Sequence, residues 1–239
     1  IAACHLQQHA KCRLQPNRSS LAATSAAFHS TPALSFASHS TSTLQRAKVH
    51  SPSLGDANGD GILDLFVTPV LGESHQIYWG QANGLFTRNQ STILPSVESK
   101  HTHYQMCSGG GIWADVNLDG FADLFIPTGQ GAPNLLYISN GTGGFTLDKA
   151  PGGPGAADTT VESCHAAFGD LNGDGLPDVI VATLAANLYY VSDGVGSWKR
   201  DTTPGGPGAS DTTMRSSMVA IADTNKDGAL DVFIATFLD

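Results

Sequence analysis

Short apolar runs recur along the chain from residue 49 onward, at intervals of 59, 55 and 53 residues. Each run follows a loop rich in Asp, Asn and Gly, and its members are leucine, β-branched or aromatic residues. Runs that are this short and bounded by turn residues are typical of buried β-strands. The four runs are Leu65-Phe66-Val67, Leu124-Phe125-Ile126, Val179-Ile180-Val181 and Val232-Phe233-Ile234. The pattern therefore predicts an all-β fold.

A second pattern follows the first three loops and predicts a hairpin in each. After the second loop its members are Asn134, Tyr137, Asn140-Gly141 and Phe145, and after the third loop Asn187, Tyr190, Asp193-Gly194 and Trp198 stand at the same spacing. After the first loop, His75, Tyr78 and Phe86 keep the spacing of the first, second and last members. Asn-Gly or Asp-Gly between two strand-like runs is a strong hairpin signal. Each repeat then holds four antiparallel strands, the size of a β-propeller blade. We expect the recurring aromatic residues to pack in the core or between blades.

The chain divides into two regions of different composition. Residues 1–48 are rich in Ala, Ser, Thr and His, contain no acidic residue and show no strand or helix period, so we expect a disordered or leader-like segment. Residues 49–239 hold the repeats, with blades expected at about 49–107, 108–163, 164–216 and, incomplete, 217–239. Without an initiator Met, and with an end soon after a strand-like run, the sequence is expected to be a fragment.

The four loops share the pattern Asp-x-Asn-x-Asp-Gly-x-x-Asp. Ca²⁺ prefers roughly six to eight oxygen ligands, and positions 1, 3, 5 and 9 supply them from side chains while position 7 offers a main-chain carbonyl. Glycine at position 6 permits the sharp turn around the ion. We therefore predict up to four Ca²⁺ ions, one in each loop. The predicted ligands are Asp56, Asn58, Asp60, Ile62, Asp64, Asp115, Asn117, Asp119, Phe121, Asp123, Asp170, Asn172, Asp174, Leu176, Asp178, Asp223, Asn225, Asp227, Ala229 and Asp231.

Two other interpretations of the loops compete with calcium binding between strands. One Asp-Asn-Asp-Gly stretch alone would suit a solvated turn, but four copies with the same continuation favour a metal site. The helix-loop-helix calcium motif shares the first six positions and needs a Glu at position 12. Position 12 is Val67, Ile126, Val181 or Ile234 here. We therefore expect a loop that joins two strands and is closed by the Asp at position 9.

The formal net charge of −9 is concentrated in the loops, which hold twelve of the 21 acidic residues. Four Ca²⁺ ions would add eight positive charges and leave a net charge of −1. The acidity is thus ligand charge, and we expect no nucleic acid partner. No apolar run approaches the roughly 18 residues that cross a bilayer, so no membrane insertion is expected of this fragment.

The cysteines and the remaining histidines leave several alternatives open. Cys107 and Cys164 lie at similar places in successive repeats, so they are either bridged in an oxidising compartment or two buried thiols. The segment 4–12 contains two Cys and two His residues at a spacing that fits no structural zinc pattern. His101 and His103 are expected to be solvated loop residues.

The loop motif and the apolar strand after it resemble FG-GAP and VCBS repeats, which occur in integrin α propellers, in the cartilage acidic protein group and in secreted microbial proteins. The resemblance covers residues 50–239; the segment from Phe168 to Val181 is similar to FG-GAP, and the hairpin from Asn134 to Phe145 is similar to VCBS. It implies a calcium-binding β-propeller, usually with seven blades. The chain holds about three and a half blades, so we expect an open set with an unpaired edge.

Three functions are consistent with these features. The first is a non-catalytic, calcium-binding module for extracellular adhesion or protein interaction, supported by weak oxygen sites suited to extracellular calcium and by the glycosylation sequons Asn89-Gln-Ser91 and Asn140-Gly-Thr142. The second is a lectin-like propeller with a glycan ligand. The third is the propeller portion of a larger secreted enzyme. The chain itself carries no nucleophile elbow, phosphate loop or zinc protease motif.

Overall fold

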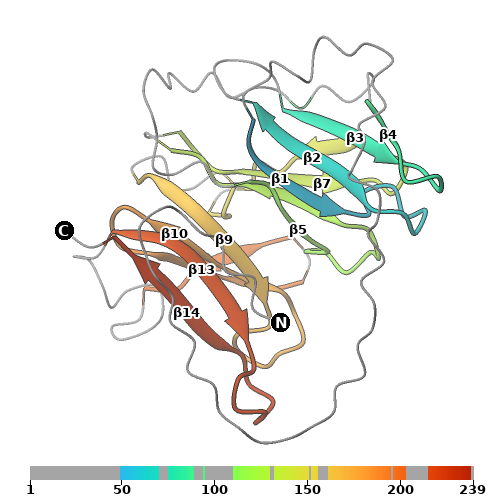
Figure 1. The fold of residues 1–239 in the computed structure, drawn as a ribbon. Coiled ribbons are helices and arrows are strands. Elements are labelled where there is room, and N and C mark those ends of the chain that lie inside the picture. Colours follow the sequence, from blue (N-terminus) through green and yellow to red (C-terminus); the bar gives the residue numbers. More distant parts are fainter. Residues whose placement is uncertain are drawn as a thin grey trace, which may run out of the picture. The chain divides into compact units, whose positions relative to one another are not determined.

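Fourteen β-strands and no helix make up the part of the chain that the computed structural model describes, and all belong to one unit (Figure 1). The described residues are 49–69, 75–88, 94, 110–129, 132–150, 152–155, 161–194, 196–202 and 215–237. The predicted all-β fold is confirmed. Among these residues there is also no helix long and apolar enough to cross a membrane. The expectations for residues 1–48, for Asn89-Gln-Ser91 and for His101, His103 and Cys107 lie outside the described residues.

The first three sheets each contain four antiparallel strands that pair in sequence order. The first holds β1 (Val49–Gly55), β2 (Asp64–Pro69), β3 (Gln76–Gly80) and β4 (Phe86–Arg88). The second holds β5 (Ile112–Ala114), β6 (Asp123–Ile126), β7 (Leu135–Ser139) and β8 (Phe145–Leu147). The third holds β9 (Ser163–Gly169), β10 (Asp178–Thr183), β11 (Leu188–Ser192) and β12 (Trp198–Arg200). Each sheet is the four-stranded propeller blade that the repeat predicted.

The fourth sheet contains only two strands within the described residues, β13 (Ser216–Ala222) and β14 (Asp231–Thr236). They pair antiparallel in the same register as the first two strands of the other blades. The structure therefore contains three complete blades followed by half of a fourth, as the sequence predicted.

The strand register explains why the loop ends at position 9. The residue before the first Asp of each loop pairs with the Asp at position 9, so the second strand begins at that Asp. These pairs are Gly55 with Asp64, Ala114 with Asp123, Gly169 with Asp178 and Ala222 with Asp231. The apolar run that follows alternates between the two faces of the sheet.

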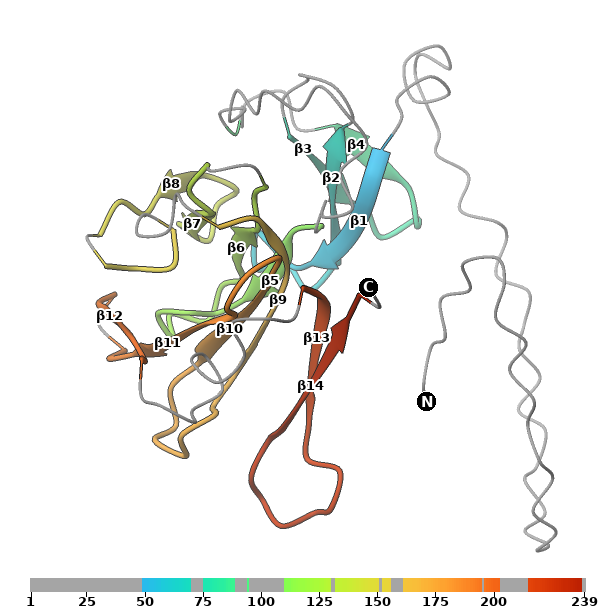
Figure 2. The ribbon, with the colours of Figure 1, turned by 90° about the vertical axis from the view of Figure 1, so that its left-hand side faces the viewer.

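The core lies between successive blades. The second strand of each complete blade directs an apolar side chain at position 11 against the next blade. These contacts run from Phe66 to Trp113, from Phe125 to Phe168 and from Ile180 to the cluster around Val219. The first strands also follow one another, with β5 and β9 side by side and β8 and β12 at the periphery (Figure 2).

The recurring tyrosines of the third strands are buried, as predicted. Tyr78, Tyr137 and Tyr190 expose 6%, 1% and 0% of their surface. Each pairs across the sheet with an apolar residue of the second strand. Because aromatic side chains bury a large area, this repeated position stabilises every complete blade.

Cys164 at the start of the third blade is 3% exposed and disulfide-bonded. Of the two alternatives for this residue, the buried free thiol is therefore wrong. The other three cysteines lie outside the described residues.

Candidate functional site

The first loop folds its polar side chains back onto its own main chain. Both carboxylate oxygens of Asp56 accept N–H groups, from Asp60 at 3.2 Å and from Gly61 at 2.8 Å. The side chain of Asn58 accepts the N–H of Asp60 at 3.0 Å and donates to its carboxylate at 3.1 Å. Asp60 in turn accepts the N–H of Ile62 at 2.8 Å. These bonds link positions 1, 3, 5, 6 and 7 into one turn.

The other three loops repeat this arrangement. The opening Asp accepts the N–H of the position-6 glycine at 2.8 Å for Asp115 and Gly120, 2.9 Å for Asp170 and Gly175, and 3.0 Å for Asp223 and Gly228. In each loop the Asn at position 3 accepts from and donates to the Asp at position 5. The carboxylate at position 5 also accepts the N–H of position 7. The sequence motif therefore specifies one local structure four times.

Glycine at position 6 is required by the backbone. Its φ is 82° in Gly61, 90° in Gly120, 85° in Gly175 and 91° in Gly228, which L-residues with a Cβ rarely adopt. Position 4 is also left-handed, which the motif does not reveal, because only two of the four loops have glycine there. Leu118 with φ 59° and Lys226 with φ 65° adopt this conformation at position 4.

The Asp at position 9 joins the loop to the third strand of its blade. Asp64 accepts the N–H of Ala57 at 2.9 Å and the N–H of Gly80 at 2.8 Å. The same pair of bonds recurs in the next two blades, from Val116 and Ser139 to Asp123 at 3.0 and 2.7 Å, and from Leu171 and Ser192 to Asp178 at 3.2 and 3.0 Å. All three aspartates are at most 1% exposed. They connect the loop to the third strand through main-chain donors, and their role as calcium ligands stays a prediction.

Asp231 in the fourth blade makes only the first of these two contacts. One carboxylate oxygen accepts the main-chain N–H of Thr224 at 3.0 Å and also the Thr224 hydroxyl. The described part of this blade has no third strand to supply the second N–H, and Asp231 is partly exposed.

The acidic groups of a loop affect one another electrostatically. Burial raises the pKa of Asp64, and the charges of Asp60 and Asp56 raise it further, while the two main-chain N–H bonds oppose the change. Burial likewise raises the pKa of Asp123 to about 6, with repulsion from Asp119 and Asp115 in the same direction. Negative charges this close favour a bound cation.

The loop residues fit calcium by donor type and by charge. Each loop offers three carboxylates and an Asn side chain, which are the oxygen donors that Ca²⁺ prefers. In their hydrogen-bonded positions, however, the described residues form no group of three or more acidic, His or Cys side chains that could hold a metal ion. Ion binding therefore requires the carboxylates to exchange main-chain donors for the metal.

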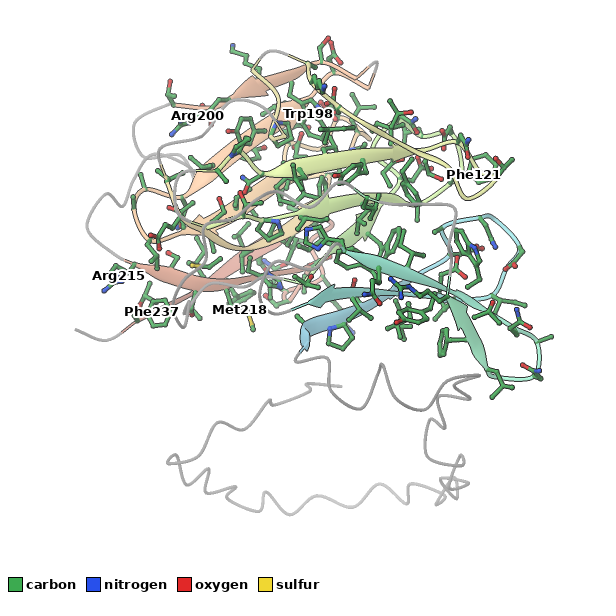
Figure 3. All side chains as sticks on the ribbon, turned by 90° about the horizontal axis from the view of Figure 1, so that it is seen from above. Phe121, Trp198, Arg200, Arg215, Met218 and Phe237 are labelled. Atoms are coloured by element: carbon green, nitrogen blue, oxygen red, sulfur yellow. The ribbon has the colours of Figure 1, made fainter. Side chains whose placement is uncertain are left out.

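Phe121, predicted to offer its carbonyl at position 7, also covers the neighbouring loop (Figure 3). A Cβ added at Gly59 would lie 2.6 Å from the Phe121 ring, and one at Gly141 would lie 2.4 Å from it. The ring thus packs on glycine backbone of the first blade and of its own hairpin. Adjacent loops are consequently held together by apolar contact.

A cavity of about 320 Å³ lies between the second and third blades. It combines apolar and aromatic surface with one amide and one carboxylate, a composition suited to a small polar ligand. Trp198, labelled in Figure 3, is the aromatic member. The lining residues are Val116, Asn117, Ile138, Asp148, Gly194, Gly196 and Trp198. Sequence reasoning assigned Trp198 to packing and missed Asp148, because the two meet only across blades.

The family model and one solved structure agree with the four-stranded blade fold. The FG-GAP-like repeat family model matches residues 56–126, 115–181 and 170–234. The fold is similar to that of an Agrocybe aegerita lectin described as specifically recognising non-reducing terminal N-acetylglucosamine, with a TM-score of 0.54 and 14% identity over 79% of this chain and 48% of that one. A Bacillus licheniformis rhamnogalacturonan lyase aligns with a TM-score of 0.45 and 15% identity over 77% and 39%. The chain thus spans about half the length of the lectin and less than half the length of the lyase. No curated protein has significant sequence similarity to the chain.

Proposed function

Since this chain belongs to the FG-GAP-like repeat family, we propose that it is a non-catalytic β-propeller module that binds Ca²⁺ in its loops and serves extracellular adhesion or protein interaction. One observation carries the calcium assignment. Four loops each place three carboxylates along one hydrogen-bonded turn, and burial, with repulsion from the neighbouring carboxylates in the same direction, raises the pKa of Asp64 and Asp123. A divalent cation would relieve this repulsion.

The second loop illustrates which groups would hold the ion. Asp115, Asn117 and Asp119 would supply side-chain oxygens, the carbonyl of Phe121 a main-chain oxygen, and Asp123 the closing carboxylate. Because the aspartates already accept main-chain N–H groups, part of the binding energy is spent on exchanging those bonds. We therefore expect weak sites with dissociation constants of about 0.1 to 1 mM, the range of extracellular calcium modules.

Two features support an extracellular location. Cys164 is disulfide-bonded, and structural disulfides persist in oxidising compartments. Asn140, the acceptor of the sequon Asn140-Gly-Thr142, is exposed on a hairpin turn. Secretion and glycosylation of the chain follow as parts of the proposal. Peptide mapping of the secreted protein would show a glycan on Asn140 if they hold.

Thermal unfolding in calcium and in chelator tests the proposal. For a loop with a dissociation constant of about 1 mM, about 10 mM Ca²⁺ stabilises the fold by roughly 1.4 kcal/mol, and several loops add. We expect a clearly higher Tm with Ca²⁺ than with chelator. Magnesium at the same concentration serves as the control, because it demands a smaller octahedral site. Equal melting temperatures in all three solutions would refute calcium binding to the folded state.

A charge-neutralising variant connects the effect to a loop. Asp119→Asn removes one exposed carboxylate and keeps an oxygen that accepts the N–H of Phe121. We expect unchanged stability in chelator and a smaller Tm rise with Ca²⁺. Asp148→Asn, outside the loops, is the matched control and should leave the calcium response intact.

A glycan ligand is the second candidate, favoured by the cavity between the second and third blades. Trp198, which is 9% exposed, contributes part of its ring to the apolar lining of the cavity, and Asp148 offers a carboxylate that accepts hydrogen bonds from sugar hydroxyl groups. The lectin with a similar fold is described as binding N-acetylglucosamine. Titration with that sugar, followed by calorimetry, separates the candidates. Saturable binding that Asp148→Asn abolishes supports a lectin, whereas no saturable sugar binding favours a protein partner.

The third alternative, the propeller portion of a larger secreted enzyme, stays a prediction. The chain covers 48% of the lectin and 39% of the lyase to which it was compared. Sequencing the complete reading frame would show whether a catalytic domain accompanies these repeats.

A further inference from the structure

Tyr189, on the third strand of the third blade, contacts the closing aspartate of its loop in a way that the first two blades do not repeat. Its hydroxyl donates to Oδ2 of Asp178 at 3.0 Å, and the side chain is only 5% exposed. Tyr189 pairs across the sheet with Ile180, which lies two residues after Asp178 on the same face of the strand. The third strand therefore gives this carboxylate a side-chain donor in addition to the main-chain N–H of Ser192.

The first two blades hold apolar side chains at the position of this tyrosine. Ile77 and Leu136 occupy the register position of Tyr189, and both are fully buried. They cannot donate a hydrogen bond. Among the described residues, Asp64 and Asp123 each accept two main-chain N–H groups. The corresponding aspartate of the third blade accepts three donors, because the tyrosine hydroxyl is added to the two N–H groups.

The opening aspartate of the third loop also accepts an additional hydrogen bond. Asp170 accepts the N–H groups of loop positions 4, 5 and 6 at 2.7, 3.0 and 2.9 Å. Among the described residues, Asp56 and Asp115 accept only the N–H groups of positions 5 and 6 in their own loops. The carboxylates that begin and end the third loop thus each accept one more hydrogen bond than their counterparts in the first two loops.

The additional donors compete with a cation for the same oxygens. A carboxylate has about four lone-pair positions, and a metal ion must use a free one or displace a donor. Asp178 has three of these positions occupied, whereas Asp64 and Asp123 have two. Displacing the Tyr189 hydroxyl would leave a buried donor without a partner, which costs free energy. The ion-free form of the third loop is therefore stabilised, and a more stable ion-free form lowers the apparent affinity for the ion.

We propose that Tyr189 sets the calcium affinity of the third loop and makes it the weakest calcium site of the three complete blades. This inference rests on the proposed calcium function of the loops. Tyr189 is a positioning residue, because it acts on the ion only through the carboxylate of Asp178. The loops of the complete blades then fill in two steps as the calcium concentration rises, with the third loop after the first two.

A calcium titration of the whole chain, prepared with isotope-labelled glycine and followed by amide NMR, reports on each loop separately. Gly61, Gly120 and Gly175 each donate their N–H to the opening aspartate of their own loop. Their amide signals should therefore change when that aspartate binds an ion. We expect the dissociation constant reported by Gly175 to be about tenfold higher than those reported by the other two glycines, which is the effect of one hydrogen bond to a charged group.

Removal of one hydroxyl group tests the role of the tyrosine directly. Tyr189→Phe keeps the buried ring and removes the donor to Asp178. We expect the dissociation constant reported by Gly175 to fall about tenfold, and those of the first two loops to stay unchanged. Tyr78→Phe is the matched control on the third strand of the first blade, where the hydroxyl donates to Gln76 at 2.7 Å. It should leave all three dissociation constants unchanged.

Failure of this inference and failure of calcium binding give different results. If none of the three glycine signals saturates with Ca²⁺, the loops bind no calcium and both proposals are wrong. If the three glycines report equal dissociation constants in the unaltered chain, calcium binding stands and the role of Tyr189 is refuted. The same holds if Tyr189→Phe leaves the constant reported by Gly175 unchanged. Because the first comparison uses the unaltered chain, it stays decisive even if the variant fails to fold.

Discussion

The third blade and the described part of the fourth begin alike, but only the third has all four strands in the described residues. Both have the same loop pattern and the same pairing of first and second strands. In the third blade Asp178 is fully buried and accepts N–H groups from Leu171 and Ser192. In the fourth, Asp231 is partly exposed and, among the described residues, its hydrogen bonds come only from Thr224.

This difference distinguishes the turn that a loop forms by itself from the burial that a complete blade provides. The loop closes in both places because its donors and acceptors lie within nine residues of one another. Burial of its carboxylate and of the apolar strand behind it depends on the third strand and on the next blade. Loop structure and core burial therefore depend on different contacts, and substitutions can perturb them separately.

The largest expected difference concerns the apolar residue at position 11. Phe125→Ala should lower the free energy of unfolding by about 3 to 5 kcal/mol, because it leaves a cavity between blades. Phe233→Ala should lower it by about 1 kcal/mol, because that ring is 52% exposed. Urea denaturation of the two variants gives both values. Equal losses would contradict the assignment of Phe125 to the inter-blade core.

Removal of the closing carboxylate should have the next largest effect. Asp123→Ala leaves the buried N–H groups of Val116 and Ser139 without an acceptor, at roughly 1 to 3 kcal/mol for each group. Asp231→Ala should change stability much less, because its surroundings are partly exposed. Denaturation in chelator excludes any contribution from bound ions. A larger loss for Asp231→Ala would show that the third strand does not decide the role of this residue.

The complete blades should also lose stability in acid. Burial lowers the pKa of His75, which precedes the third strand of the first blade and lies 5.5 Å from the Phe66 ring, from 6.5 to about 4. The unfolded chain therefore binds the proton first, so stability is fully present above pH 6.5 and is lost as the pH falls towards 4. The loss reaches about 2 kcal/mol at pH 5 as an upper limit.

The His75→Gln variant is the control for this pH dependence. It should show a shallower loss of stability than the parent between pH 7 and pH 5, measured by urea denaturation at each pH. Parallel curves for the two proteins would mean that His75 is protonated in the folded state, against the lowered pKa.

The smallest predicted effect lies within the loops. Leu118 and Lys226 are left-handed at position 4, with φ of 59° and 65°, where the other two loops have glycine. Leu118→Gly should raise stability by about 1 kcal/mol, because glycine adopts this conformation without strain and Leu118 is 56% exposed. Gly59→Ala should lower stability, because its Cβ would meet the Phe121 ring. Thermal melts compare the two, and a destabilised Leu118→Gly would contradict backbone strain.

Much of the fold could be predicted from the sequence. The apolar runs, the repeated Tyr and the Asn-Gly turn predicted four antiparallel strands per blade, and the structure confirms them. Position 9 was predicted as the residue that closes a calcium site, and that role stays a prediction. Its hydrogen-bond partners were not predicted. Gly80, Ser139 and Ser192 lie 14 to 16 residues from their aspartates, and no side-chain pattern marks a main-chain donor.

The candidate sites divide in the same way. The predicted calcium ligands come from a motif of nine residues, and the hydrogen bonds that shape each loop lie within that motif. The cavity beside Trp198 does not come from a motif, because Asn117 and Asp148 of one blade meet Trp198 of the next only after the sheets pack.

By itself, the sequence determined the strands, the loop turns and the blade period of this protein, since these depend on residues close in the chain. The tertiary structure decided burial. Phe125 and Phe233 occupy the same position of the same motif, yet one is 1% and the other 52% exposed. Likewise the Ser139 hydroxyl reaches the carbonyl of Ala57, 82 residues away, only because two blades pack together. Such contacts depend on neighbouring blades, so the local sequence does not predict them.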